Sequence, residues 1–403
     1  MTPFNQFYRK SQAERLAVVQ DYLSMNQTPH LTDEIANQMI ENYIYNYELP
    51  LGVATNFCIN GKQYVVPMAT EEPSVIAAAS NGAKRLGNIT AVTAKRELIG
   101  QIVLLASGKQ REVVDALAES HDDLLQVARE TIPNMVKRGG GPTRLWTQVH
   151  EEFVTLYLAL NPCDAMGANV MNTVLETLSP QVQTITGCDA ILNILSNYTT
   201  EAITTATVSI PLDKIGHETA QRIALASRYA QLDVYRAATH NKGIMNGIDA
   251  VVVATGNDWR AVEASVHAYA SRNGQHKGLA QWHIDEMNQT LEGELSLPLP
   301  IATVGGTLSV HPTAKQSLAL LQCESATELA NILAAVGLAQ NFAALRALVT
   351  DGIQKGHMSL QARSLALQVG ATIDEVPQLV AKLKQQPRMD SQIARELLAE
   401  LRK

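Results

Sequence analysis

The feature of this sequence that most constrains its fold is a change of pattern that begins at about Gly100 and ends at about Pro211. Within this stretch, short apolar runs typical of strands alternate with amphipathic helical runs. The segments before and after it are rich in helix signals instead. A chain of 403 residues is also too long for one simple hydrophobic core. We therefore expect an α+β protein in which a small two-layer domain is inserted into a larger, helix-rich domain.

The inserted stretch predicts the element order β-α-β-α-β-β. The expected strands cover residues 102–106, 153–158, 190–195 and 206–210, and the expected helices cover residues 112–130 and 165–178. A flexible turn is expected at residues 139–142, Gly-Gly-Gly-Pro. No GxGxxG follows any of these strands, and Walker, GxSxG and HExxH motifs are absent as well. A nucleotide cofactor would therefore need a site outside the Rossmann pattern.

Three local signals lie outside the inserted stretch. Residues 57–66 predict a hairpin, because Asn60-Gly61 supplies the positive φ angles of a tight turn. The small residues from Ser74 onward predict a buried helix that neighbouring backbone can approach closely. Short amphipathic helices are expected in the last fifty residues, for example 391–401, and they suggest a mobile C-terminal flap.

Charge and cysteine content exclude several classes of protein. The formal net charge of −7 argues against nucleic acid as the main partner, because phosphate binding needs a dense cationic surface. The four cysteines form no CxxC pair, so neither a zinc site nor a disulfide framework is expected. The first residues lack the apolar core of a signal peptide, and no run approaches the ~18 apolar residues of a membrane span. We expect a soluble cytoplasmic protein without a metal ion.

Two clusters place charged side chains beside apolar elements. Glu71-Glu72 precedes the small-residue helix, where carboxylates either complement the helix dipole or include one buried, protonated general acid. Lys242 lies among small residues and glycines, just before an expected apolar strand at 250–254. It is either a loop lysine that pairs with a nearby acid or a cation placed where negative charge develops on a carbonyl oxygen.

Three further residues leave two interpretations open. Asp258, like its neighbour Asn257, caps a helix that runs to about residue 273, or it meets Lys242 across the expected strand. His357 is either structural or a proton donor on a closing segment. Asp164 either caps the helix expected from residue 165 or marks a helix N-terminus open to an anion such as pyrophosphate.

In their order along the chain, these segments resemble the hydroxymethylglutaryl-CoA reductases, and more closely the soluble bacterial class II branch. The matching segments are residues 41–42, 49–54, 67–74, 164–169, 238–259, 304–306 and 356–358. The resemblance covers nearly the whole chain. It departs from the family at Tyr45, where the ENxxG pattern has a glycine.

The resemblance implies a reduction of a CoA thioester to mevalonate in two hydride steps, with release of CoA. It implies that Lys242 stabilises the developing oxyanion and that Glu72 supplies a proton to the carbonyl oxygen. Asp258 would lie between these two residues and tune their pKa values, and His357 would protonate the departing CoA thiolate. A lysine, a glutamate and an aspartate in contact titrate as one unit.

The resemblance also implies the binding residues and the domains. Substrate contacts fall on Ser74, Arg236, Asn246 and Arg363, the last of these for the CoA phosphates. Cofactor contacts fall on Asp164, Met166, Gly167, Asn169, Gly305 and Gly306. The expected domains are a large CoA-binding catalytic domain (1–100 and 214–350), a small ferredoxin-like, non-Rossmann cofactor domain (101–213) and a helical flap (351–403).

The expected assembly is a homodimer, or a larger assembly of dimers, with active sites at the interface. The expected cofactor is NADPH, with NADH as the alternative. The same catalyst working in reverse would oxidise mevalonate with NAD and CoA. The ratio of NADH to NADPH turnover separates these two directions.

Overall fold

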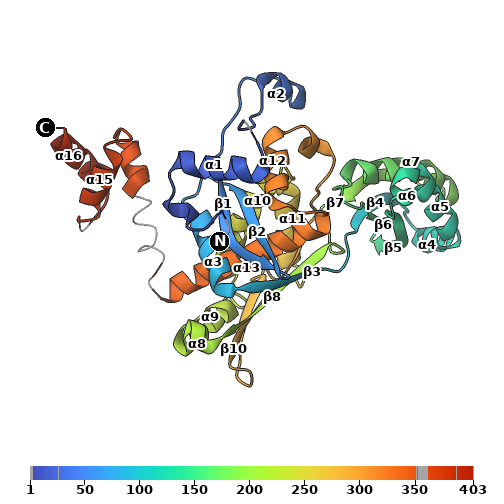
Figure 1. Ribbon diagram of the computed structural model, residues 1–403. Helices are drawn as coiled ribbons and strands as arrows, with labels where there is room; N and C mark the ends of the chain where they lie inside the picture. The colour runs from blue at the N-terminus through green and yellow to red at the C-terminus, as the bar shows by residue number, and fades with distance from the viewer. Residues whose placement is uncertain (1–2, 26, 351, 353–361, 387, 403) are drawn as a thin grey trace.

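The structure is a computed structural model that describes residues 3–25, 27–350, 352, 362–386 and 388–402 (Figure 1). It contains a large domain around a six-stranded sheet, a small domain around a four-stranded sheet, and a group of C-terminal helices. The small domain and the C-terminal helices lie at opposite ends of the large domain (Figure 1). The expectation of an α+β fold is confirmed.

The large sheet has the strand order β2-β1-β3-β8-β10-β9. Its strands are β1 (Leu51–Ile59), β2 (Lys62–Ala69), β3 (Asn88–Thr93), β8 (Ile203–Pro211), β9 (Ala280–Asp285) and β10 (Thr290–Pro298). β1 pairs in parallel with β3, and the other pairs are antiparallel. The expected β1–β2 hairpin is confirmed, with Asn60 at φ 51° and Gly61 at φ 81° in its turn.

Helices enclose this sheet. They are α3 (Val75–Leu86), α8 (Leu212–Ile215), α9 (His217–Tyr229), α10 (Val234–Ala254), α11 (Trp259–Ala270), α12 (Pro312–Leu321) and α13 (Ala326–Val349). Two more helices, α1 (Gln12–Leu23) and α2 (Asp33–Met39), precede β1. The small residues of α3 do allow a close approach, because a Cβ at Gly82 would collide with the backbone of Ala339 in α13. The expected close approach is therefore confirmed, and the helix buries one face while Ala77, Asn81, Lys84 and Arg85 are exposed.

Helix α13 is the central helix of the large domain. In length and composition it could cross a membrane, and no other described helix could. In this fold, however, 67% of its most apolar window is buried inside the protein. It packs against α3, α9 and α10 and against strands of the large sheet. Its apolar character is that of a core helix, which is hydrophobic on all sides because it is surrounded by protein.

The small domain has the strand order β5-β6-β4-β7, with antiparallel pairing throughout. Its strands are β4 (Leu98–Leu105), β5 (Gly141–His150), β6 (Phe153–Asn161) and β7 (Ala190–Ser196). Its helices are α4 (Gln110–Glu119), α5 (His121–Thr131), α6 (Pro133–Lys137) and α7 (Ala168–Thr186). The resulting β-α-β-β-α-β order is ferredoxin-like. It separates this domain from a Rossmann fold, whose sheet is mostly parallel.

Three sequence predictions are wrong in detail. The expected turn at 139–142 leads directly into β5, a strand missed because several of its side chains are polar and exposed. The strand expected at 206–210 belongs to β8 of the large sheet rather than to the small domain, because a strand pattern does not reveal its partner. The strand expected at 250–254 is the last part of α10. A short apolar run that is buried on all sides looks the same in either conformation.

The C-terminal helices form a core of their own. Residues 362–368 are helical and are followed by α15 (Val376–Leu383) and α16 (Ser391–Leu401). Ala366, Leu379 and Ala394 are among the buried residues that these helices share. The predicted helix at 391–401 is confirmed at both ends. Figure 1 shows these helices apart from the large domain.

Candidate active site

Glu72 and two side chains of α10 meet at one point of the large domain. The Nζ of Lys242 lies 2.7 Å from Oε2 of Glu72, and the Nδ2 of Asn246 donates to Oε1 of the same carboxylate at 3.3 Å. Lys242 and Asn246 are four residues apart, so their side chains emerge one helical turn apart on the same face. The Lys242 and Glu72 side chains are 61% and 39% exposed. The pair is therefore open to a ligand.

Lys242 lies within α10 and not in a loop as the sequence suggested. Glu72 lies in the short segment between β2 and α3, where its N–H donates to Oγ1 of Thr70. Ser74, two residues later, has a left-handed backbone (φ 77°) and begins α3. A strand end and a helix face thus bring together residues that are 170 positions apart.

The other expected substrate residues lie in different places. Arg236 is in the first turn of α10, half-buried, and burial lowers the pKa of its guanidinium. Ser74 follows Glu72 in the segment that enters α3. Arg363 is exposed on the C-terminal helices. His357 lies outside the described residues.

Asp258 is the N-cap of α11. Its Oδ1 accepts hydrogen bonds from the N–H groups of Arg260 and Ala261 at 3.0 and 3.2 Å. It also accepts from the Nε of Arg260 at 3.3 Å. The capping interpretation is therefore confirmed. The expected contact with Lys242 is not among the hydrogen bonds of this carboxylate in the described part of the chain.

The preceding residue, Asn257, links two parts of the site. It is buried, and its Oδ1 accepts from the N–H of Ala302 at 2.7 Å while its Nδ2 donates to the carbonyl of Ala302 at 3.1 Å. The turn before α11 is thereby held against the segment that contains Gly305 and Gly306. The sequence predicts Asn257 only as a candidate helix cap. Its position next to a capping aspartate gave no sign of this longer contact.

Asp164 joins the small domain to the large one. Its backbone carbonyl accepts from the N–H of Thr303 at 2.9 Å, and its Oδ1 accepts from the N–H of Ala326 at 2.8 Å. The expected role as N-cap of a helix from residue 165 is wrong, because α7 begins at Ala168 with Gly167 as its N-cap. The Asp164 carboxylate instead satisfies an N–H group in the first turn of α13.

A half-buried arginine supports the same junction. Arg96 lies between the two domains, and its guanidinium donates to the carbonyls of Cys163 and Ile301. Its pKa is lowered by burial, an effect that the negative charge of Asp164 partly offsets. No pattern in the sequence indicates this role for Arg96. It follows Lys95, and two consecutive basic residues are typical of an exposed linker.

The expected cofactor segments lie side by side as a consequence. Residues 164–169 and 303–306 are held together by the hydrogen bond between Asp164 and Thr303. No side chain caps the first turn of α7, so its N–H groups suit an anionic ligand such as a pyrophosphate. Gly305 and Gly306 have positive φ angles, and a Cβ on either would meet open space. These residues fit a dinucleotide that approaches the backbone closely.

The remaining cofactor candidates lie on the same loop. Met166 is half-buried and Asn169 is exposed at the start of α7. Within the described ranges, no three His, Cys, Asp or Glu side chains gather closely enough to hold a metal ion.

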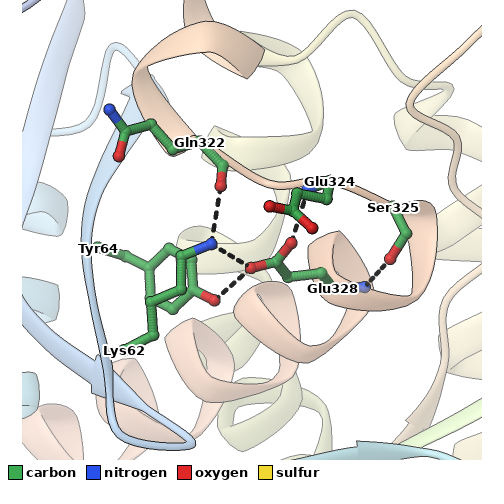
Figure 2. Close-up of polar contacts among 6 residues, drawn as sticks. All are labelled: Lys62, Tyr64, Gln322, Glu324, Ser325 and Glu328. Carbon is green, nitrogen blue, oxygen red and sulfur yellow. Dashed lines mark hydrogen bonds and ion pairs between the residues drawn. The ribbon is translucent and has the colours of Figure 1, made fainter.

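The N-terminal end of α13 is fixed by a second carboxylate, Glu328 (Figure 2). Glu328 accepts from the Nζ of Lys62 at 2.7 Å, the hydroxyl of Tyr64 at 2.5 Å and the N–H of Glu324 at 2.6 Å. Burial, together with this carboxylate, raises the pKa of the nearby Cys323 thiol to about 11. The thiol therefore stays neutral, and the cluster reads as structural support that ties the β1–β2 hairpin to α13.

Comparison with known proteins gives a consistent family. The family model described as hydroxymethylglutaryl-coenzyme A reductase matches residues 10–362. The chain is 41% identical to the 3-hydroxy-3-methylglutaryl-coenzyme A reductase of Archaeoglobus fulgidus, over 98% of this chain and 94% of that protein. It is 35% identical to the probable enzyme of Borreliella burgdorferi, over 89% of this chain and 85% of that protein.

Solved structures agree with these sequences. The Streptococcus pneumoniae 3-hydroxy-3-methylglutaryl-coenzyme A reductase superposes with a TM-score of 0.83 and 41% identity, covering 99% of both chains. A class II enzyme from the same organism, bound to NADPH in open conformations, gives a TM-score of 0.81 and 42% identity. That comparison covers 98% of this chain and all of the other.

Proposed function

This chain belongs to the hydroxymethylglutaryl-coenzyme A reductase family, and from this premise we propose that it reduces (S)-3-hydroxy-3-methylglutaryl-CoA to mevalonate and releases CoA. The observation that carries the proposal is the contact of Lys242 with Glu72, supported by Asn246. An ammonium and a carboxyl group at one open position can act together on a single carbonyl oxygen. The reaction belongs to the mevalonate route to isoprenoids.

Lys242 and Glu72 divide the work on that oxygen. Bound NADPH supplies a hydride to the carbonyl carbon in each of the two reductions. The ammonium of Lys242 stabilises the negative charge that grows on the oxygen, because a fixed cation needs no rearrangement as the charge develops. Glu72, in its protonated form, donates the proton that turns the oxyanion into a hydroxyl. The thioester thus becomes a hemithioacetal. Its C–S bond then breaks to release CoA and give mevaldehyde, which is reduced in the second step.

Asp258 and His357 complete the proposed catalytic set. Asp258 adds a negative charge near the turn that Asn257 fixes, and it acts on the charges of Lys242 and Glu72 through the electrostatic field. His357 protonates the CoA thiolate as CoA leaves. Because a thiolate is a much weaker base than an alkoxide, one histidine is sufficient for this step.

The small domain is proposed to hold the nicotinamide cofactor. The first turn of α7, with Met166, Gly167 and Asn169, would bind the pyrophosphate, and Gly305-Gly306 would let the dinucleotide approach the backbone. The side chain of Asp164 already accepts a hydrogen bond from α13, so we assign it to holding this loop in place. We assign the elements from β4 to β7 to the small cofactor domain, in place of residues 101–213. The proposed large catalytic domain and C-terminal flap keep their expected bounds. NADPH is the proposed cofactor, as in the pneumococcal relative, with NADH as the alternative.

A homodimer is proposed because large apolar side chains are exposed on α9, in the turn after it and at the start of α10, the helix that carries Lys242. Leu225 and Tyr229 lie on α9 and Leu232 lies in the turn that follows it; their side chains are 58%, 55% and 65% exposed. Tyr235, at the start of α10, is 88% exposed on the same helix as Lys242. Such patches mark protein interfaces, and a second copy would cover them and enclose the site. A soluble protein in the cytoplasm is the proposed setting.

An absorbance assay at the nicotinamide band tests the proposed reaction. Purified protein is given the CoA substrate with NADPH and, separately, with NADH. Oxidation of NADPH that depends on the substrate, with two equivalents consumed per mevalonate formed, is the expected result. Mevalonate oxidation with NAD and CoA that is faster than reduction would indicate the degradative direction. No substrate-dependent change with either cofactor would overturn the proposal.

Substitution of His357→Gln tests the division of roles. The variant should lose much more activity with the CoA thioester than with mevaldehyde, because mevaldehyde reduction releases no thiolate. Steady-state rates with both substrates measure the difference. Equal losses would contradict the assignment of His357 to the leaving thiolate.

Sedimentation of the purified protein tests the dimer. Tyr229→Glu should shift the protein toward monomer, because a buried charge at an apolar interface is costly. The matched control is Met287→Glu, in the exposed turn between β9 and β10, where Met287 is 92% exposed. A parent protein that sediments as a monomer at assay concentration would contradict the proposed assembly.

A further inference from the structure

The face of α10 that carries Lys242 and Asn246 continues to Asp249. Residues at i, i+4 and i+7 lie along one side of a helix, so Asp249 is the next member of the same row. The row passes from exposed at Lys242 to half-buried at Asn246 and Asp249. Asp249 Oδ1 is fully buried. A titratable group therefore lies at the inner end of the row whose outer members, Lys242 and Asn246, contact Glu72.

Asp249 meets a second carboxyl group, Glu263 of α11. The two side chains are within hydrogen-bonding range of each other. Two ionised carboxylates are both acceptors and cannot bond to each other. Asp249 Oδ1 also has no hydrogen-bond partner among the described residues. One proton held between the two groups removes the conflict between them, as in other carboxyl pairs at close range.

The proton belongs on Asp249 and the negative charge on Glu263. The Nε2 of His267 lies 2.8 Å from Oε2 of Glu263, and this contact lowers the pKa of Glu263. Burial and the neighbouring Glu263 raise the pKa of Asp249 to about 8. His267 stacks on His276 with ring centroids 5.6 Å apart, which fixes its ring beside the glutamate.

The surroundings of Asp249 contain few other charges. Glu263 is the ionisable side chain that acts on it directly, and α11 contributes both Glu263 and the histidine paired with it. On its own helix, Lys242 lies seven residues away, or ~10 Å along the axis. Among described residues, no ionisable group of α3, α12, α13 or β2, which also pack against α10, contributes to the shift of Asp249.

We propose that Asp249 is a positioning residue of the reductase site. Glu263 keeps the carboxyl group of Asp249 neutral, so that no second negative charge lies on the face of α10 that bears Lys242 and contacts Glu72. The proposal rests on the proposed function and goes beyond it by adding two residues. Its physical basis is the charge that develops on the substrate oxygen. An ionised Asp249 would add a negative charge on the side of α10 where this oxyanion forms and would repel it.

The pH dependence of mevaldehyde reduction with NADPH tests the proposal in the full-length protein. For the parent, kcat should fall several-fold above about pH 8, as Asp249 ionises. In Asp249→Asn this fall should disappear. In Glu263→Gln it should begin about one pH unit lower, because the charge that keeps Asp249 protonated is gone. The two amide substitutions are therefore expected to move the alkaline limit in opposite directions.

Glu286→Gln is the matched control, since Glu286 is exposed in the turn between β9 and β10. Its profile should match that of the parent. Coincident profiles for the parent and both test variants would overturn the proposal, and so would shifts of both in the same direction. If Asp249→Asn does not fold, Glu263→Gln decides alone, because the Glu263 side chain is 29% exposed and its loss is tolerated more easily. A parent without any substrate-dependent turnover would overturn the proposed function and this inference together.

Discussion

The two faces of α10 carry similar residues, but one face forms the candidate site and the other packs inside the protein. One face presents Lys242 and Asn246 to Glu72 and is partly open to solvent. The other face buries His240 and Asn241, which are 1% and 0% exposed. Each face therefore carries one asparagine and one basic side chain, which is Lys242 on the open face and His240 on the buried face. What separates them is whether the polar groups are already satisfied by the protein itself.

The buried face makes most of its polar contacts within the fold. Asn341 of α13 donates to the Nε2 of His240 at 3.1 Å, and its Oδ1 accepts from Trp282 Nε1 at 2.9 Å. Asn241 bonds to the backbone of residues 277 and 279. The open face keeps an ammonium and a carboxyl group where a ligand can reach them. A buried polar residue on a helix is thus evidence of function only when its partners leave room for a substrate.

Lys242→Ala should give the largest effect and defines the open face. We expect kcat to fall at least ~10³-fold with both the thioester and mevaldehyde, since both reductions build charge on the same oxygen. The side chain is 61% exposed, so the melting temperature should stay close to that of the parent. Steady-state rates and a thermal melt measure the two properties. A large loss of stability would mean that Lys242 belongs to the structural face.

The two asparagines provide a matched pair across the helix. Asn241→Ala should lower the free energy of unfolding by roughly 2–3 kcal/mol, because Lys277 O and Leu279 N lose their partners inside the protein. Asn246→Ala should leave stability nearly unchanged and lower kcat about 10-fold, because one donor to Glu72 is lost. Urea unfolding and steady-state kinetics on both variants separate the effects. Similar changes in both would remove the distinction between the faces.

Much of this fold could be predicted from the sequence, but α10 shows where such prediction fails. Its apolar positions follow a helical period, yet Gly243 and Gly247 led us to expect a loop and then a strand. Gly247 has a packing reason, since a Cβ there would press on Val336 and Gln340 of α13. This reason exists only in the folded protein. Local patterns therefore located the residues but not the element that carries them.

The site was predictable in part for a similar reason. The contact of Lys242 with Glu72 was expected, because both residues match motifs whose chemistry converges on one carbonyl group. Asp258 did not join them, because its carboxylate caps α11 in this chain. Asp249 and Glu263 went unnoticed, since an aspartate and a glutamate on separate helices show no sign in sequence that they face each other. Pairing between elements is the information that a single sequence lacks.

The pH dependence of stability should expose the buried histidine. Burial and the nearby Arg236 lower the pKa of His240 to about 4, whereas the unfolded value is 6.5. As the pH falls below 6.5, the unfolded chain binds a proton that the folded protein refuses. Stability is therefore fully present above pH 6.5 and is lost as the pH falls toward about 4. At about pH 5 this loss should amount to about 2 kcal/mol, at 1.36 kcal/mol per pKa unit.

Comparison with His240→Gln isolates this effect from that of the carboxylates. The free energy of unfolding of each protein is measured by urea titration between about pH 7 and about pH 5. The variant should be less stable at neutral pH but should lose less on acidification. Parallel curves for the two proteins would show that His240 is not held neutral by the buried face.

Substitution of Asp258 should give the smallest effect on stability. It tests whether this residue both caps α11 and assists Lys242 and Glu72. Asp258→Asn keeps an oxygen that can cap α11, so the free energy of unfolding should change by less than about 0.5 kcal/mol. Asp258→Ala removes the cap and should cost about 1 kcal/mol. If the carboxylate charge also assists Lys242 and Glu72, both variants should lose activity to a similar extent despite their different stabilities. Full activity in Asp258→Asn would assign Asp258 to helix capping alone, and the open face of α10 would then act without it.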